Sequence, residues 1–115
     1  MKIKAGIIGA AGYTGGELIR LLLNHPNVMI DFTQSKSNAG ELVSTIHRDL
    51  TGDTDMRFCE AFHTDIDVLF LCSAHGEAKK FLLQNKLPNQ LVIIDLSNDF
   101  RLKADAVFEE QTFVY

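Results

Sequence analysis

The sequence predicts an α/β fold built on a doubly wound parallel sheet, and three observations carry that prediction. Short apolar stretches alternate with amphipathic ones along the chain. The first of them, residues 3–8, runs into a glycine-rich turn and then into a leucine-rich helix. A later stretch, residues 91–96, is largely apolar at successive positions, as in a central strand covered on both faces. Strands alternating with helices imply parallel pairing through right-handed crossovers.

The other elements follow from hydrophobic spacing and from the residues that end a helix. A helix is predicted over residues 13–24, where leucine and isoleucine recur at helical spacing and Pro26 follows. Residues 34–38 read as a polar loop. Further strands are predicted at residues 28–33, 57–62 and 68–72. Further helices are predicted at residues 39–46, around Ala78, Phe81 and Leu82 before Pro88, and at residues 104–110.

Length and composition indicate one small globular domain. A chain of 115 residues can bury a single core, and 46% hydrophobic with 23% charged residues is ordinary for such a domain. The net charge of −4 shows no basic surplus, so neither nucleic acid nor a membrane surface is expected as a partner. The apolar runs are too short to span a bilayer, and the N-terminus lacks the core of a signal peptide. We therefore expect a cytoplasmic protein.

The two cysteines are predicted to be buried, reduced thiols. Cys59 and Cys72 lie in strand-like runs and do not form a C-x-x-C pair. A disulfide or a metal site is the alternative for such residues, and no metal site is predicted.

The glycine-rich turn is the first feature that points to a ligand. Gly9, Gly12 and Gly15 are spaced by three residues between the first strand and the first helix. In a doubly wound sheet this turn lets the backbone approach a pyrophosphate at the positive N-terminus of the helix. Gly9 would permit the tight turn, Gly12 the close approach, and Gly15 the packing of the helix on the sheet. The prediction is a Rossmann-type dinucleotide-binding domain, with a ligand-free structural turn as the alternative.

The loop after the second strand favours NADP over NAD. NAD-binding domains usually place an acidic residue at the end of that strand to hold the ribose 2′-hydroxyl. Asp31 lies in the middle of the predicted strand, and the strand leads instead into Ser35, Lys36 and Ser37. Two hydroxyls around one ammonium group suit a 2′-phosphate. A solvated polar loop is the alternative.

Four segments together resemble the N-terminal cofactor domain of the N-acetyl-γ-glutamyl-phosphate reductase family. They are GAAGYTGGELIRLL, TQSKSNAGELVSTIHRDLTG, VLFLCSAHGEAKK and IDLSNDFRLK, in this order. The resemblance spans essentially the whole chain. It implies NADPH-dependent reduction of an acyl phosphate to a semialdehyde with release of phosphate, in arginine biosynthesis. Aspartate-semialdehyde dehydrogenases open similarly but lack the Asp-Phe-Arg-Leu continuation, and they remain the nearest alternative.

The resemblance also implies which residues bind the cofactor. The family commonly has arginine at the position of Lys36, so the preference for NADP is expected to be weaker here. Ala74 stands where the family typically has proline. For His75, a helix-capping surface role is the alternative. The implied cofactor-binding residues are Gly9, Gly12, Tyr13, Thr14, Gly15, Gly16, Ser35, Lys36, Ser37, Ser73, His75 and Gly76.

Catalytic residues are not expected within the chain. In the family, the nucleophilic cysteine and the acid/base histidine lie downstream of the segment matched here. Ser97, Asp99 and Arg101 are implied to contact an anionic substrate or to shape their loop, with a local Asp99–Arg101 ion pair as the alternative. Residues 1–115 are thus predicted to be the NAD(P)-binding domain of a longer enzyme that forms homo-oligomers through its other domain. A non-catalytic regulatory module that binds NADP is the other interpretation.

Overall fold

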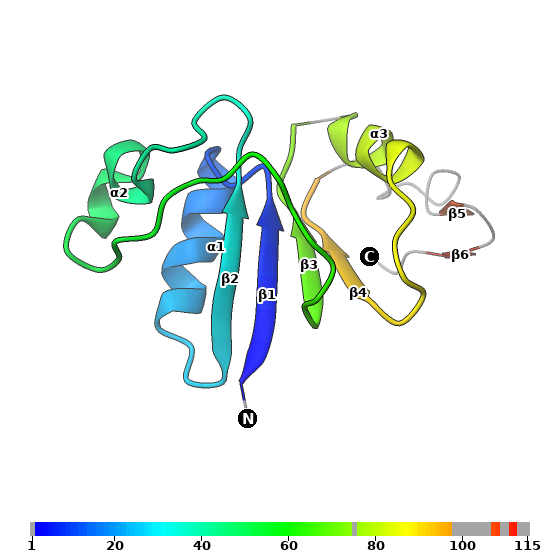
Figure 1. Cartoon of the computed structure of the whole chain (residues 1–115), viewed down its shortest axis with the longest axis horizontal. Helices are drawn as coiled ribbons and strands as arrows, with labels where there is room; N and C mark the ends of the chain where they lie inside the picture. The colour runs from blue at the N-terminus through cyan, green and yellow to red at the C-terminus, as the bar shows by residue number, and fades with distance from the viewer. Residues whose placement is uncertain (1, 75, 98–106, 109–110, 113–115) are drawn as a thin grey trace.

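A computed structural model of the chain describes residues 2–74, 76–97, 107–108 and 111–112 (Figure 1). Strands and helices alternate through most of the chain, as the sequence predicts. In chain order the elements are β1 (Ile3–Ile8), α1 (Tyr13–Leu23), β2 (Val28–Gln34), α2 (Val43–Ile46), the 3-10 turn η1 (Arg48–Leu50), β3 (Val68–Leu71), α3 (Glu77–Gln84), β4 (Val92–Asp95), β5 (Val107–Phe108) and β6 (Gln111–Thr112).

The first four strands form one parallel sheet in the order β2-β1-β3-β4. β1 pairs with β2 on one side, starting at Ile3 opposite Val28, and with β3 on the other side, starting at Ala5 opposite Val68. The chain therefore winds outward from β1 in one direction, returns, and continues in the other direction. This confirms the predicted doubly wound sheet. The carboxyl ends of β1, β2 and β3 meet at one edge of the sheet.

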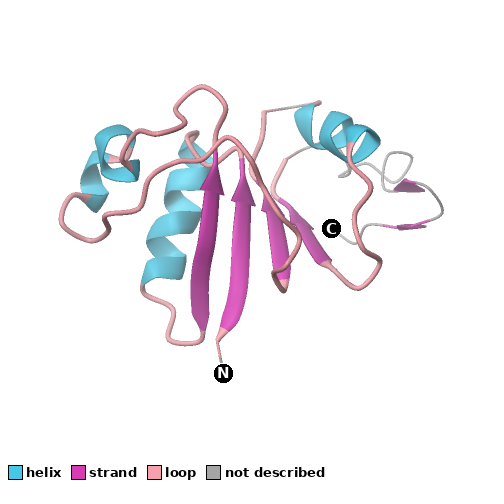
Figure 2. Ribbon diagram, in the orientation of Figure 1, coloured by secondary structure: helices cyan, strands magenta, loops and turns pink. Residues whose placement is uncertain are grey.

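The sheet has an apolar core on each face because successive side chains of β1 point to opposite sides. Ala5 and Ile7 are fully buried in the core that also holds Ile19 of α1. Ile8 belongs to the other core, together with Ala78 of α3. The two helices thus cover different faces and different halves of the sheet (Figure 2).

β4 does not have both faces buried, contrary to the sequence prediction for residues 91–96. It pairs only with β3, at the edge of the described sheet. The side chains of Val92 and Ile94 are 55% and 40% exposed. Their partners in the register are Val68 and Phe70, which pack toward the α1 core. On that face no described helix extends as far as β4.

The strand predicted at residues 57–62 is wrong, because this segment changes its pairing partner after only one residue. Arg57 makes an isolated antiparallel bridge with Leu42, and Cys59 makes an isolated parallel bridge with Gln34. A continuous ladder needs successive residues to pair with the same strand. The segment instead links the end of β2 to the region of α2.

Two predicted helices are also wrong in part. Residues 39–46 contain only the single turn α2, because Gly40 has a φ of +88° and donates its N–H to the Phe58 carbonyl outside any helix. Val107–Phe108 form a strand paired with β6, where residues 104–110 were predicted to be helical. The remainder of that predicted helix, residues 104–106 and 109–110, lies outside the described residues.

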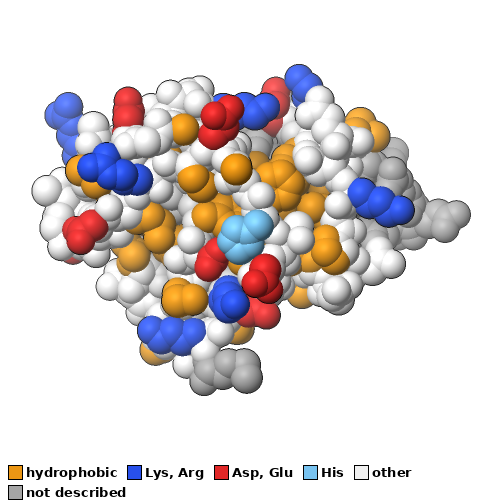
Figure 3. All heavy atoms as spheres, viewed as in Figure 1, with side chains coloured by type: hydrophobic (Ala, Val, Ile, Leu, Met, Phe, Trp, Pro, Cys, Tyr) orange, Lys and Arg blue, Asp and Glu red, His pale blue; other side chains and the backbone are white. Residues whose placement is uncertain are grey.

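Surface charge is mixed on the face in Figure 3, where Lys and Arg side chains alternate with Asp and Glu among apolar ones. Over the described ranges, no helix is long and apolar enough to cross a membrane. Nor does any group of three or more His, Cys, Asp or Glu among those residues lie where it could hold a metal ion.

Candidate functional site

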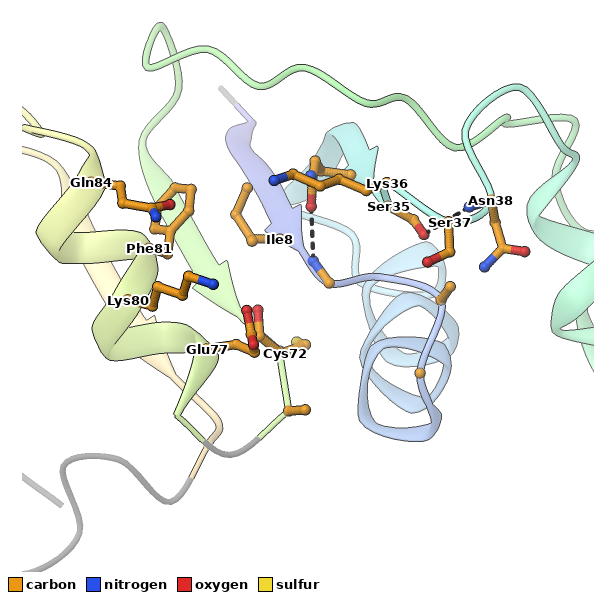
Figure 4. A pocket seen from close by; sticks show the side chains of 16 residues that line it. Ile8, Ser35, Lys36, Ser37, Asn38, Cys72, Glu77, Lys80, Phe81 and Gln84 are labelled. Carbon is orange, nitrogen blue, oxygen red and sulfur yellow. Dashed lines mark hydrogen bonds between the residues drawn. The ribbon is translucent and has the colours of Figure 1, made fainter.

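A cavity of about 410 Å³ opens at the carboxyl ends of the strands (Figure 4). Its walls come from the turn after β1, the loop after β2, the segment after β3 and one side of α3. Because β2 and β3 flank β1, the cavity lies where the strand order reverses, which is where open α/β sheets bind their ligands. The residues that line it are Ile8, Gly9, Ala11, Gly12, Gln34, Ser35, Lys36, Ser37, Asn38, Cys72, Ser73, Ala74, Glu77, Lys80, Phe81 and Gln84.

Gly9 makes the tight turn that the sequence predicts. Its φ of +73° lies in the left-handed region that side chains disfavour. A β-carbon there would lie 3.0 Å from the backbone N and Cα of Ser73. Gly9 is therefore required both by its conformation and by the close approach of the segment after β3.

Gly12 has no such structural requirement. It precedes α1 with φ −77° and ψ 175°, which any residue can adopt, and no residue other than its two chain neighbours comes within 4 Å of the place of a β-carbon. Gly12 lines the cavity, so a side chain there would extend into open space. This is the geometry expected where a backbone must leave room for a ligand.

The start of α1 is suited to an anion. No side chain caps this helix, and its first turn contains no acidic residue. The first N–H groups of a helix have no partner within the helix, and the helix dipole makes this end positive. A phosphate beside Gly12 would be stabilised by both effects.

Gly15 and Gly16 are buried and do not line the cavity. A β-carbon on Gly15 would lie 2.5 Å from the Ala10 carbonyl oxygen, and one on Gly16 would lie 2.5 Å from Nδ1 of His47. Gly15 thus allows α1 to pack against the turn itself, rather than against the sheet as the sequence analysis expects. Gly16 makes room for a histidine that the sequence analysis did not single out.

Tyr13 and Thr14 are exposed on the first turn of α1 and do not line the cavity, with Tyr13 85% exposed. Their assignment as cofactor-binding residues stays a prediction.

The predicted 2′-phosphate loop borders the cavity. Ser35 is buried, donates its backbone N–H to the Cys59 carbonyl, and accepts a hydrogen bond on Oγ from the Asn38 N–H. Lys36 and Ser37 are exposed at the rim (Figure 4). Lys36 forms no ion pair with any described residue, so its charge is available to a ligand.

Asp31 does not reach this loop. It lies within β2, and its carboxylate pairs with the exposed side chain of His63. The position that usually binds a ribose 2′-hydroxyl in NAD-binding domains is therefore not acidic here.

Gln34 holds the glycine turn in place, although the sequence predicts only the start of a polar loop at this residue. It is the last residue of β2 and is buried. Its Oε1 accepts the N–H of Gly9 at 3.2 Å, and its Nε2 donates to the Glu60 carbonyl at 3.1 Å. Gln34 thus ties the glycine turn to the segment after residue 57.

The segment after β3 supplies the wall opposite the loop of β2. Ser73 lines the cavity beside Gly9. Burial raises the pKa of the Cys72 thiol to about 12, and the charge of Asp95 adds to this effect. Burial also raises the pKa of Cys59. Cys72 is buried, as predicted, whereas Cys59 is only partly buried, which corrects the prediction for that residue. Both are free thiols in this structure, and neither is activated as a nucleophile.

Two of the other predicted residues, Gly76 and Ser97, are described and do not line the cavity. Gly76 precedes α3 with a φ of +86° and does not line the cavity. Ser97 is buried, and its N–H donates to Oδ1 of Asp95 at 2.9 Å. Three predicted residues lie outside the described ones: His75, Asp99 and Arg101.

α3 contributes a wall that the sequence analysis missed. Its lining residues are Glu77, Lys80, Phe81 and Gln84. They recur at the spacing of one helix face. This spacing could have identified them from the sequence, because the helix follows a strand whose carboxyl end was already expected at the site. Phe81 offers an apolar surface, and Lys80 brings a second positive charge to the cavity (Figure 4).

A parallel sheet with a cavity at its switch point, a glycine turn and an uncapped helix N-terminus defines a dinucleotide-binding α/β domain. Comparison with known proteins gives the family. The sequence model for "Semialdehyde dehydrogenase, NAD binding domain" matches residues 4–109, and the chain belongs to this family.

Curated relatives are similar over nearly the whole chain. An N-acetyl-gamma-glutamyl-phosphate reductase of Bacteroides thetaiotaomicron is 54% identical over 114 residues, which is 98% of this chain and 34% of the relative. The reductase of Flavobacterium johnsoniae is 50% identical over 113 residues, 98% of this chain and 35% of the relative. The chain thus spans about a third of the length of these relatives.

A solved structure shows the same fold. The aspartate semialdehyde dehydrogenase of Candida albicans, determined with NADP, superposes with a TM-score of 0.68 at 22% identity. The match covers 88% of this chain and 31% of that protein.

Proposed function

We propose that this chain is the NADP(H)-binding domain of an N-acetyl-γ-glutamyl-phosphate reductase. The reaction is the NADPH-dependent reduction of the acyl phosphate to N-acetyl-glutamate semialdehyde with release of phosphate, a step of arginine biosynthesis. This proposal rests on one observation: over 98% of its length, the chain is 50–54% identical in sequence to relatives named for that reaction.

The lining of the cavity supports the assignment of different predicted residues to different parts of the cofactor. The cofactor supplies a hydride when bound. Gly12 and the start of α1 hold the pyrophosphate. Lys36 and Ser37 hold the 2′-phosphate, and their exposure beside the cavity supports this role. Ser73, which lines the cavity beside Gly9, would contact the nicotinamide half, and the roles of His75 and Gly76 there stay predictions.

The remaining chemistry is proposed to come from outside residues 1–115. Reduction of an acyl phosphate through a thioester needs a thiolate, and burial keeps Cys59 and Cys72 protonated at neutral pH. The catalytic domain, which also carries the oligomer contacts, belongs to the rest of the enzyme. A cytoplasmic location is proposed because both thiols are free, as they are in a reducing compartment.

A domain exchange tests the enzyme assignment. In the Bacteroides thetaiotaomicron reductase, the matching third is replaced by this chain, and the hybrid is assayed for NADPH oxidation with N-acetyl-γ-glutamyl phosphate. Activity is expected, and a Gly12→Val hybrid should lose it. A folded hybrid that binds NADPH but turns over no substrate would contradict the assignment to this reductase.

The isolated 115-residue chain provides the complementary test. It should bind NADPH in a fluorescence titration and show no turnover with the acyl phosphate, because it lacks a reactive thiolate. If turnover were observed and Cys72→Ser abolished it, the catalytic site would lie within this chain after all.

A further inference from the structure

His47 is buried directly behind the glycine turn. It follows α2, is 9% exposed, and its Nε2 lies 2.8 Å from the carbonyl oxygen of Ala10. A carbonyl oxygen only accepts hydrogen bonds, so Nε2 carries the proton and donates. The ring bridges two segments that are more than thirty residues apart in the chain.

The surroundings of the ring hold it in this position. Its centroid lies 6.0 Å from that of Phe58 in an edge-on arrangement, and its backbone N–H donates to the Val43 carbonyl. On the other side the ring fills the space that Gly16 leaves, since a β-carbon on Gly16 would approach Nδ1 to 2.5 Å. The second of the two adjacent glycines in α1 is thus explained by the histidine.

Ala10 is held on three sides. Its N–H donates to the Gln34 backbone carbonyl at 2.9 Å, its own carbonyl accepts from His47, and Gly15 packs against its backbone. The peptide unit between Ala10 and Ala11 therefore has one fixed orientation.

This orientation determines where the next N–H points. The described chain contains no cis peptide bond, and in a trans peptide the carbonyl and the following N–H point in opposite directions. With the Ala10 carbonyl directed at His47, the Ala11 N–H is directed away from it. Ala11 lines the cavity next to Gly12, so an N–H directed away from His47 is placed to serve a ligand there.

We propose that His47 is a positioning residue that aims the Ala11 N–H at the pyrophosphate of the bound cofactor. The inference rests on the proposed function, in that it requires a dinucleotide in the cavity. It predicts that His47 affects NADP and NAD equally, because both carry the pyrophosphate. The 2′-phosphate loop, in contrast, affects only NADP.

The test is a titration of the chain and its variants with NADP and with NAD, together with thermal melts. His47→Leu should lower both affinities by about tenfold, the effect of roughly one hydrogen bond to an anion, and leave their ratio unchanged. His47→Gln keeps an N–H donor at a similar reach and should recover most of the loss. Leu22→Ala is the matched control, because Leu22 packs in the same core and does not line the cavity, so this variant should change stability only.

A second variant covers the case in which His47→Leu does not fold. Gly16→Ala keeps the histidine but forces its ring to shift, which should disturb the hydrogen bond to Ala10 and weaken the binding of both cofactors in the same way. A folded His47→Leu or Gly16→Ala variant with unchanged affinities, or a His47→Gln variant no better than His47→Leu, would overturn the inference alone. If the unmodified chain bound neither cofactor, the proposed function would fail and this inference with it.

Discussion

Two walls of the cavity, the glycine turn after β1 and the loop after β2, are built in different ways. The glycine turn is fixed by its surroundings, with Gln34 accepting the N–H groups of both Gly9 and Ala10 and His47 donating to the Ala10 carbonyl. The loop after β2 instead presents Lys36 and Ser37 to solvent. In the proposed function, the glycine turn faces the pyrophosphate, which all dinucleotides share, and the loop after β2 faces the 2′-phosphate, which distinguishes NADP from NAD. Because Lys36 and Ser37 are exposed, substitutions there should change the cofactor preference without disturbing the fold.

The largest effect on cofactor affinity is expected when a side chain fills the space beside the glycine turn. Gly12→Val adds a side chain whose β-carbon would meet no residue other than its chain neighbours within 4 Å, so the fold should tolerate it while the pyrophosphate is excluded. NADP and NAD affinities should both fall by about a hundredfold. Isothermal titration and thermal melts on the same variant measure both quantities. A variant that melts far lower yet binds NADP normally when folded would show that the glycine serves chain geometry alone.

The next effect concerns stability rather than binding. Gly9→Ala should destabilise the fold by about 2 kcal/mol or more, from the positive φ together with the 3.0 Å contact to Ser73. Gly52→Ala is the matched control, since Gly52 has a φ of +87° and nothing within 4 Å of a β-carbon. Urea unfolding of both variants separates conformational strain from contact. Equal decreases in the free energy of unfolding would mean that Ser73 moves away from the new β-carbon without destabilising the fold.

The exposed wall is expected to give a smaller and selective effect. Lys36→Ala should lower NADP affinity by about tenfold and leave NAD affinity unchanged, because only NADP carries the 2′-phosphate. Lys36→Arg should raise the preference for NADP through bidentate contacts. Lys86→Ala removes the same charge away from the cavity and is the control. Equal affinities for NADP and NAD in the unmodified chain would contradict the assignment of this loop.

The smallest effect concerns Cys72, which is buried directly after the end of β3. Its folded-state pKa of about 12 exceeds the ordinary value of 9.0, so the folded chain retains a proton that the unfolded chain loses. Its contribution to stability is complete below pH 9 and declines as the pH rises toward 12. Melts between pH 7 and pH 10 should show a loss above pH 9 that Cys72→Ala lacks. Rapid alkylation of Cys72 in the native chain at pH 8 would show that the thiol is not protected.

The glycine spacing and the polar loop were sufficient to predict the fold class and both walls of the cavity. Gly9, Gly12, Lys36 and Ser73 are far apart in the chain, yet all border the same cavity. They could be placed together because parallel strands bring their carboxyl ends to one edge, whatever the exact packing. The predicted roles of Tyr13 and Thr14 stay predictions.

Only the tertiary structure decided the features that depend on a partner distant in sequence. The segment from Arg57 to Cys59 reads as a strand, but it pairs with two different neighbours and forms none. The apolar run of β4 reads as a central strand, but it lies at the edge of the described sheet. Local periodicity records how a segment alternates between apolar and polar residues. It does not record which element covers each face.

The sequence by itself determined the order of strands and helices, the turn after β1 and the charge of the loop after β2, because each depends on residues close together in the chain. The tertiary structure decided why the turn holds its shape. Nothing in the sequence distinguishes Gln34 and His47 from other polar residues. They hold the turn only because folding brings their side chains into hydrogen-bonding distance of Gly9 and Ala10. A buried backbone carbonyl must find a donor, and the donor that it finds can lie anywhere along the chain.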